Sequence, residues 1–144
     1  EDLLPHQWSK LIFNSAVNSI SAITDLPHVR AFAHREELAD LGHLVYAMMH
    51  EGKRIAEACG VALADDPWLM NVKAVSHGQT GNEEYGHVTS MLEDVRNRRL
   101  TEVDWITGAI VREAARAGVP APYHETLYRL VKAHESSWKR RPAH

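Results

Sequence analysis

The sequence has a single cysteine, no long apolar run and no glycine-rich nucleotide motif, and each absence excludes a class of protein. Because Cys59 is the only cysteine among the 144 residues, no disulfide can form within the chain, and a reducing compartment, the cytoplasm, is expected. No apolar run reaches the length of a membrane span. The pattern GxGxxG is absent, so these residues are not expected to bind the pyrophosphate of a dinucleotide.

Charge and composition narrow the class further. Sixteen Lys and Arg residues against nineteen Asp and Glu residues give a net charge of −3, and the only basic cluster is short, at Lys139, Arg140 and Arg141. Nucleic-acid-binding domains need a basic surface, so we expect no nucleic-acid partner. An apolar content of 44% in 144 residues predicts one globular domain, residues 1–144, with a sizeable core.

The first residues, EDLLPHQW, contain neither an initiator methionine nor a signal-like apolar region. We therefore expect the chain to be a soluble piece of a longer protein; processing of the N-terminus would explain its start equally.

Apolar residues recur at helical spacing, and no segment has the pattern of a strong strand, so the sequence predicts an all-helical domain. A first helix is expected from about residue 6. Further helices are expected to begin at residue 67 and to span residues 35–59, 90–98, 101–117 and 122–138. In the last of these, Leu127, Leu130 and Val131 are expected to face inward. The segment 76–86 has the composition of a loop.

Local signals mark several of these ends. Gly60 and Gly118 are each followed by valine, which predicts a left-handed residue and an apolar contact closing a helix. Asp66 followed by Pro67 predicts an N-cap and the first helical position.

A polar stripe interrupts the first apolar helix. Lys10, Asn14 and Asn18 lie four residues apart, and Ser21 falls on the same stripe, whereas the rest of the helix is mostly apolar. A helix that is apolar on most sides is usually buried, and buried amides and ammonium groups need hydrogen-bond partners. Other side chains or a polar ligand would both satisfy the stripe.

A second polar group occurs between Thr89 and Val111. Ser90 with Glu93 forms a capping-box pattern, and Thr101 with Asp104 forms a looser one. Either serves to cap a helix, and a serine at a helix start also suits a bound carboxylate. Glu102 has two readings as well: it stabilises the dipole of its helix, or it faces a buried lysine and balances its charge.

Ten histidines raise the question of a metal site. His43 and His50 lie two helical turns apart, about 10 Å along the axis, which is too far to share a metal ion. The HExxH pattern is absent. No metal site is predicted.

The polar residues fall within a resemblance to a known family. KLIFNSAVNSISAIT, followed by SMLEDVRNRRLTEVDWITGAIVREAARAGVPAPYHETLYRLV, resembles the C-terminal domain of ketopantoate reductase, also called 2-dehydropantoate 2-reductase. The resemblance runs from about Ser9 to Lys132 and rests on KxxxNxxxN, SMxxD and TExD with a glycine four residues on. It implies a helical domain of the 6-phosphogluconate dehydrogenase C-terminal type, packed on an N-terminal Rossmann domain that binds NADPH and is absent from this chain.

The same resemblance implies an activity and a role for each polar residue. The family reduces ketopantoate to pantoate in the biosynthesis of pantothenate, the precursor of coenzyme A. Lys10 matches the catalytic lysine, which would act as general acid. Asn14 and Asn18 match substrate-binding asparagines, and Ser90 matches a contact to the substrate carboxylate. Glu102 matches the carboxylate that works with the lysine on the cofactor side.

Departures from the family pattern leave the exact 2-keto acid open. Thr107 replaces a common asparagine, Glu93 a common glutamine and Thr89 a common second serine. The alternatives are a reductase of a related 2-keto acid and a non-catalytic helical binding or dimerisation module with the same fold. Helical domains of this type can pair, so a homodimer is compatible with the sequence. Without a nucleotide-binding half, this chain alone is expected to be inactive.

Overall fold

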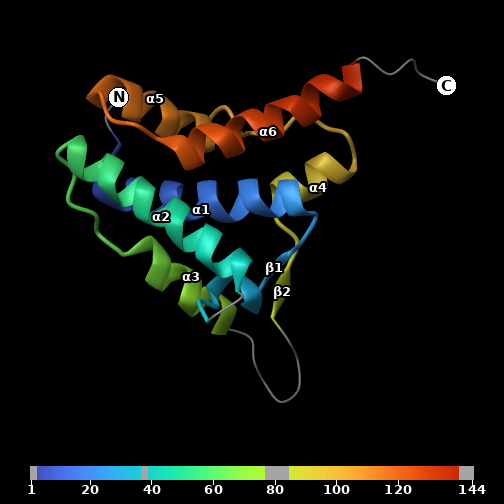
Figure 1. Cartoon of the computed structure of the whole chain (residues 1–144), viewed down its shortest axis with the longest axis horizontal. Helices are drawn as coiled ribbons and strands as arrows, with labels where there is room; N and C mark the ends of the chain where they lie inside the picture. Colours follow the sequence, from blue (N-terminus) through green and yellow to red (C-terminus); the bar gives the residue numbers. More distant parts are fainter. Residues whose placement is uncertain (1–2, 37–38, 77–84, 140–144) are drawn as a thin grey trace.

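The computed structural model describes residues 3–36, 39–76 and 85–139. Its helices are arranged around α1, as Figure 1 shows, and the all-helical prediction is confirmed. The elements in chain order are α1 (Pro5–Thr24), β1 (His28–Val29), the 3₁₀ helix η1 (Arg30–Ala33), α2 (Asp40–Ala58), α3 (Pro67–Ser76), β2 (Gly86–His87), α4 (Ser90–Arg96), α5 (Thr107–Ala117) and α6 (Pro122–Lys139). None of the described helices is both long enough and apolar enough to cross a bilayer.

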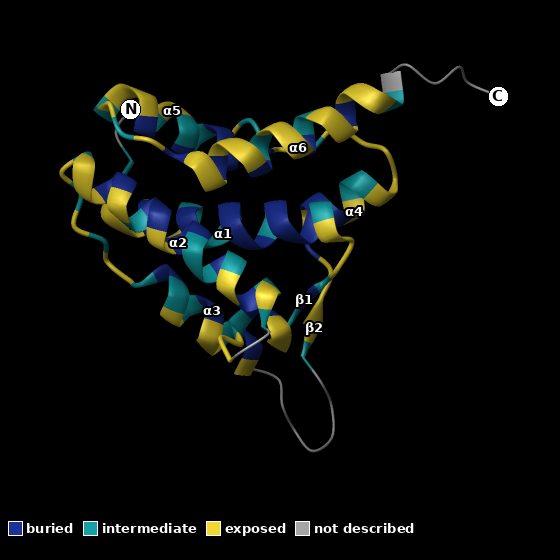
Figure 2. Cartoon of the chain, in the orientation of Figure 1, coloured by how far each residue is buried: buried dark blue, intermediate teal, exposed yellow. Residues whose placement is uncertain are grey.

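Helix α1 is the central element, and it packs against every other α-helix. Figure 2 shows most of its middle turns buried. Its apolar residues meet those of α2, α5 and α6 in one main core. Burying one aliphatic, methionine or phenylalanine side chain completely stabilises a fold by about 1.5–3 kcal/mol. The largest of these buried side chains are Phe32, Ile12, Ile20, Met48, Met49, Ile55 and Ile110.

Several helix ends lie where local signals predict them. Gly60 has φ +76°, and the N–H groups of Gly60 and Val61 donate to the carbonyls of Glu57 and Ala56. Gly118 (φ +71°) closes α5 with the same two-bond pattern. These are Schellman endings, in which glycine takes the left-handed position without steric cost.

The predicted start of α3 is confirmed as well. The carboxylate of Asp66 accepts a hydrogen bond from the N–H of Trp68 at 2.9 Å, and Pro67 is the first helical residue. Asp66 also pairs with Lys53 at 3.0 Å, which ties the start of α3 to α2.

Two predicted helix starts are wrong. Helix α2 begins at Asp40 rather than Arg35, because the backbone is still extended at His34 (φ −89°, ψ 127°) after η1. Helix α5 begins at Thr107 rather than Thr101. The N–H and the hydroxyl of Thr101 both donate to Glu135 at 2.7 Å, so a carboxylate of α6 holds this segment in a turn.

Smaller differences concern ends, one side chain and one strand pair. Helix α4 stops at Arg96, two residues early, and Arg98 takes a left-handed conformation (φ +52°). Leu130 is 43% exposed, so its prediction as an inward residue is wrong, whereas Leu127 and Val131 are buried as predicted. Strands β1 and β2 form a two-residue antiparallel pair that is too short to leave a sequence pattern. Most of the loop expected at 76–86 lies outside the described residues.

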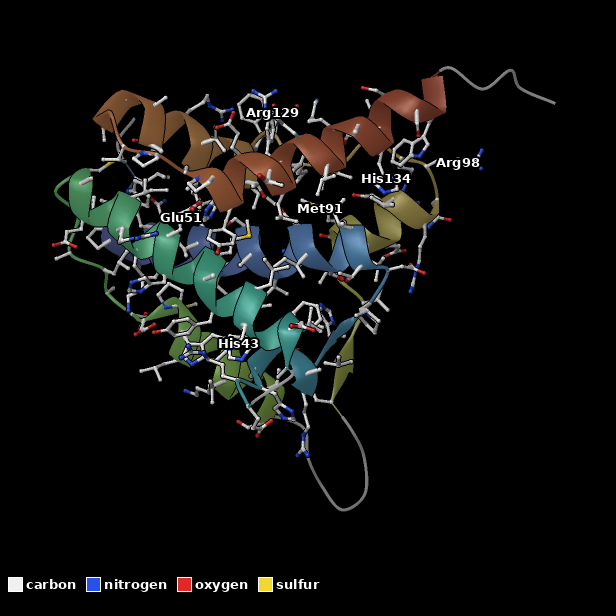
Figure 3. The ribbon with its side chains drawn as sticks, in the orientation of Figure 1. His43, Glu51, Met91, Arg98, Arg129 and His134 are labelled. Atoms are coloured by element: carbon white, nitrogen blue, oxygen red, sulfur yellow. The ribbon has the colours of Figure 1, made fainter. Side chains whose placement is uncertain are left out.

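A buried polar cluster joins α1, α2 and α6. Glu51, labelled in Figure 3, accepts the backbone N–H groups of Tyr123 at 3.0 Å and His124 at 2.8 Å, together with His124 Nδ1 at 2.8 Å. His124 Nε2 lies 3.1 Å from the hydroxyl of Ser15. Glu51, His124 and Ser15 are at most 1% exposed, so no substrate reaches this serine, and the cluster is structural.

Candidate functional site

A cleft of about 620 Å³ lies beside α1, bordered by the strand pair, by the start of α4 and by the segment before α5. Its volume is in the range of small-molecule sites. Four of the five site residues predicted from the sequence line it: Asn14, Asn18, Ser90 and Glu102. The fold thus brings together side chains that are up to 88 positions apart in sequence (from 14 to 102).

Asn14 and Asn18 supply the α1 side of the cleft. Both are half-buried, and Nδ2 of Asn18 donates to the backbone carbonyl of Asn14 at 2.9 Å. This bond orients the Asn18 amide and leaves its Oδ1 as an acceptor. The expectation of a buried stripe is therefore wrong for its first three members, and only Ser21 is fully buried. The middle of the stripe, Asn14 and Asn18, is polar where it borders the cleft.

Lys10 is exposed and does not line the cleft. It borders an adjoining hollow of about 260 Å³ together with Leu11, Asn14 and Trp105. Asn14 lines both hollows, and Lys10 is one helical turn before it. In the described part of the chain, no ion pair joins Lys10 to Glu102. The interpretation of Lys10 as a buried ammonium is a mistaken one, because the start of α1 is less covered than its middle.

Ser90 opens α4 without capping it. Thr89 is the N-cap: its hydroxyl accepts the N–H of Leu92 at 3.1 Å, and its backbone is extended. The capping box predicted for Ser90 and Glu93 is thus wrong by one residue. The hydroxyl of Ser90 is not occupied by that cap, and the residue is exposed at the cleft.

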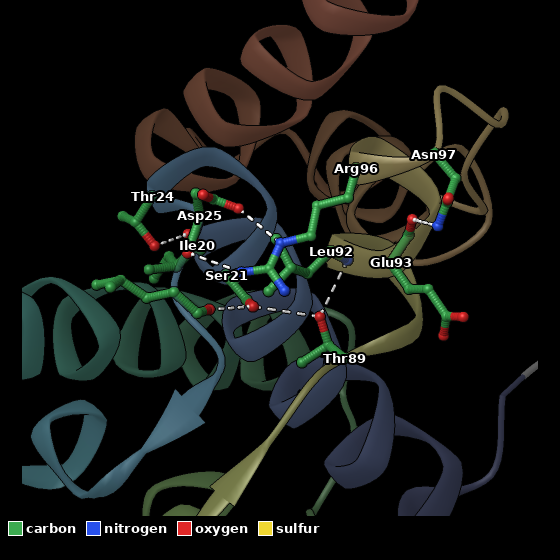
Figure 4. Close-up of polar contacts among 10 residues, drawn as sticks. Ile20, Ser21, Thr24, Asp25, Thr89, Leu92, Glu93, Arg96 and Asn97 are labelled. Carbon is green, nitrogen blue, oxygen red and sulfur yellow. Dashed lines mark hydrogen bonds and ion pairs between the residues drawn. The ribbon is translucent and has the colours of Figure 1, made fainter.

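Thr89 also fixes α4 against the end of α1. Figure 4 shows its hydroxyl donating to Ser21, which donates in turn to the carbonyl of Leu26. Next to these hydrogen bonds, Arg96 of α4 forms an ion pair with Asp25, at the end of α1, over 2.8 Å. Two independent contacts therefore set where Ser90 stands relative to Asn18.

Glu102 lies in the turn before α5, not in the first turn of that helix. Its carbonyl accepts the N–H groups of Trp105 at 2.9 Å and Ile106 at 3.1 Å, which closes the turn. The side chain is exposed and lines the cleft together with Ser90. The interpretation of Glu102 as a helix-dipole residue is therefore wrong, and its role beside the lysine stays a prediction.

Sequence reasoning missed two further residues that line the cleft, His28 and Tyr85. His28 is 2% exposed and bonds Asn71 at 2.7 Å and Tyr85 at 3.2 Å. Burial lowers the pKa of His28 despite the opposing hydrogen bond to Asn71, so the ring is neutral at pH 7. These partners are 43 and 57 positions away, so no local spacing could have identified them.

The described residues contain no group of three or more His, Cys, Asp or Glu side chains arranged to hold a metal ion.

The comparison with protein families is decisive for the class of this domain. Residues 2–135 match the model of the family described as ketopantoate reductase PanE/ApbA C terminal. The chain belongs to this family. The family resemblance drawn from KxxxNxxxN, SMxxD and TExD is thereby confirmed, and the all-helical domain is the C-terminal domain of ketopantoate reductases.

Individual relatives agree with this result. The chain is 30% identical to a 2-dehydropantoate 2-reductase of Pyrobaculum aerophilum over 94% of its own length and 45% of the relative's. It is similar to the crystal structure of a PanE/ApbA family ketopantoate reductase from Ralstonia eutropha JMP134 (TM-score 0.76, 30% identity, 93% of this chain and 42% of that one). It is also similar to D-mandelate dehydrogenase in a ternary structure with NADH and anilino(oxo)acetate (TM-score 0.74, 27% identity, 92% and 41%). The chain spans less than half the length of these relatives.

Proposed function

We propose that this chain is the substrate-binding and catalytic part of an NADPH-dependent 2-dehydropantoate 2-reductase, which reduces ketopantoate to pantoate in pantothenate biosynthesis. One observation carries the proposal: Asn14, Asn18, Ser90 and Glu102 line a single cleft in a chain of the ketopantoate reductase family. Lys10, one turn before Asn14, borders the adjoining hollow.

Each residue has a physical task in the proposed reaction. NADPH would supply a hydride to the ketone carbon, which leaves negative charge on the ketone oxygen. The ammonium of Lys10 stabilises that charge and donates the proton to the oxygen, as a general acid. The amides of Asn14 and Asn18 orient the keto acid, because each can donate and accept hydrogen bonds. The hydroxyl of Ser90 donates to the substrate carboxylate.

Glu102 is assigned the edge of the cleft that faces the cofactor. Glu102 is exposed and lines the cleft, and we assign its carboxylate the task of holding the Lys10 ammonium toward the ketone oxygen. Both side chains are exposed in this chain. The proposed reaction therefore needs another body to cover them and to exclude water from the proton transfer.

That body would be an N-terminal Rossmann domain of the same protein. Among the described residues, the only strands are the two-residue β1 and β2, so these residues provide no strand–turn–helix cradle for a pyrophosphate. The relatives' greater length leaves room for such a domain. We therefore propose that this domain holds most of NADPH and that the chain alone is inactive. We also propose that the complete enzyme is cytoplasmic and forms a homodimer.

A second candidate, reduction of another 2-keto acid, is favoured by the similarity to D-mandelate dehydrogenase. The two candidates share the roles of Lys10, Asn14, Asn18 and Ser90 and differ in the substituent carried beside the ketone.

Consumption of NADPH with ketopantoate, followed by absorbance in the longest natural form of this gene product, tests the proposal. Lys10→Ala should abolish most of the turnover with little change in KM, because a general acid acts in the transition state. Lys73→Ala, an exposed lysine on α3, is the matched control and should retain full activity. Absence of turnover, with pantoate failing to raise the melting temperature, would favour the non-catalytic binding module instead.

A further inference from the structure

One part of the cleft lining is built around a buried histidine, His28. The ring of His28 meets those of Phe13, Phe32 and Tyr85 edge to face, with centroids 6.0, 5.2 and 5.3 Å away. Both ring nitrogens have partners: Nε2 lies 2.7 Å from Oδ1 of Asn71, and Nδ1 lies 3.2 Å from the hydroxyl of Tyr85.

The direction of each hydrogen bond follows from Asn71, the residue next to His28 in this series of hydrogen bonds. Nδ2 of Asn71 donates to the carbonyl of Phe32 at 3.0 Å, so Oδ1 is the atom that faces His28. Because Oδ1 only accepts, Nε2 of His28 must carry the ring proton. The other nitrogen of the neutral ring then accepts, and the Tyr85 hydroxyl is its donor. Burial raises the pKa of Tyr85, so the hydroxyl keeps the proton that it donates.

This arrangement fixes what Tyr85 offers to a ligand. A phenol has one proton, and that of Tyr85 is directed to His28, so toward the cleft its oxygen can only accept. Asn14, Asn18 and Ser90, which line the same cleft, supply amide and hydroxyl donors. The cleft lining therefore offers donors to an acidic group and, at Tyr85, an acceptor.

We propose that Tyr85 is a specificity-determining residue that accepts a hydrogen bond from a hydroxyl on the substituent of the 2-keto acid, and that His28 and Asn71 position it. The substrate class is then a 2-keto acid whose side chain carries a hydroxyl. This inference rests on the proposed reductase function and narrows it, because the alternative substrates with a plain alkyl or aryl substituent have no proton to offer there.

A pair of substrates that differ in one oxygen tests this assignment. Ketopantoate is 4-hydroxy-3,3-dimethyl-2-oxobutanoate, and 3,3-dimethyl-2-oxobutanoate has the same skeleton without the hydroxyl. In the longest natural form, wild-type kcat/KM should favour ketopantoate by at least about tenfold, the effect expected of one well-made hydrogen bond. Tyr85→Phe should remove about tenfold of that preference by lowering the ketopantoate value alone.

Two further variants separate specificity from structure. Tyr123→Phe removes a hydroxyl from a tyrosine that is 40% exposed on α6, and should leave the preference unchanged. His28→Phe keeps an aromatic ring but removes the partner that orients the Tyr85 hydroxyl, and should lower the preference by less than Tyr85→Phe does, because the oxygen can still accept. The double variant should lose no more than Tyr85→Phe alone, because both changes act on one hydrogen bond.

The outcomes separate the two proposals. If the wild type reduces both keto acids and Tyr85→Phe leaves their ratio unchanged, the inference is overturned while the reductase stands. A wild type that prefers phenylglyoxylate over ketopantoate also overturns it.

If no keto acid is reduced, the reductase proposal fails, and the Tyr85 contact is then tested by binding: calorimetry compares the affinity for pantoate with that for 2-hydroxy-3,3-dimethylbutanoate. A pantoate preference that Tyr85→Phe abolishes supports the Tyr85 contact, and equal binding of the two acids refutes it.

Discussion

Replacing Glu51 by glutamine tests whether the buried cluster, rather than the apolar core alone, holds α6 in place. The carboxylate accepts three hydrogen bonds, two at Oε1 and one at Oε2. Glutamine keeps one oxygen and turns the other into a donor. With that oxygen facing His124, the new NH₂ group opposes the N–H of Tyr123, so one charge-assisted bond is lost and two buried donors face each other. We expect a loss of about 3 kcal/mol at pH 7.

The pH dependence gives a second readout. Burial alone would raise the pKa of Glu51, but the hydrogen bonds from the ring and backbone of His124 and from the backbone of Tyr123 outweigh it and lower the pKa. A carboxylate with a lowered pKa stabilises the fold above its unfolded pKa, about 4.5, and loses that contribution as the pH falls through the folded value. The gap between wild type and Glu51→Gln should therefore narrow below about pH 4.5.

Thermal and urea unfolding followed by circular dichroism measure both effects. For a chain of this size, about 3 kcal/mol corresponds to a decrease in Tm of roughly 10 °C. Glu125→Gln is the matched control on α6: its carboxylate and its partner Arg129 are 50% and 74% exposed, so the loss should stay below about 0.5 kcal/mol. Equal losses in the two variants at pH 7, or a gap that is undiminished at pH 4, would refute the role assigned to Glu51.

Three further substitutions test a helix cap, a binding contact and a close packing contact. Thr89→Ala should destabilise the chain by about 1 kcal/mol in urea unfolding, because the N-cap of α4 is lost, whereas Ser90→Ala should leave the unfolding midpoint unchanged and weaken pantoate binding in calorimetry. The reverse pattern would make Ser90 the cap. Gly42→Ala should prevent the native packing of α2, because its Cβ would lie 1.5 Å from the carbonyl oxygen of His34; a soluble variant with wild-type Tm would contradict this contact.

The features that the sequence predicts well are those decided by neighbouring residues. A left-handed glycine followed by an apolar residue ends α2 and α5, and Asp66 with Pro67 starts α3, because these signals act within one turn. The start of α5 is different. Glu135, 34 positions away, takes both donors of Thr101 and keeps the next residues out of the helix. No local pattern contains that information.

The same division applies to the site. Asn14, Asn18, Ser90 and Glu102 could be chosen because a family motif names them, whereas His28 acquires its significance only from Asn71 and Tyr85. The sequence also placed the capping role one residue away from Thr89. Serine and threonine are both favoured N-cap residues, with serine ranked slightly higher, and only the extended backbone at Thr89 shows which of the two is the cap.

The polar stripe of α1 shows why burial was the hardest property to predict. Steps of four residues drift by about 40° around a helix, so successive members of the stripe face different surroundings. Lys10 is exposed, Asn14 and Asn18 are half-buried, and Ser21 is fully buried under α4. In the proposed enzyme this gradient has a use: the half-buried amides of Asn14 and Asn18 orient the keto acid, and the exposed start of α1 leaves the Lys10 ammonium accessible to the approaching cofactor domain. A uniformly buried stripe would have shielded Lys10 from that approach.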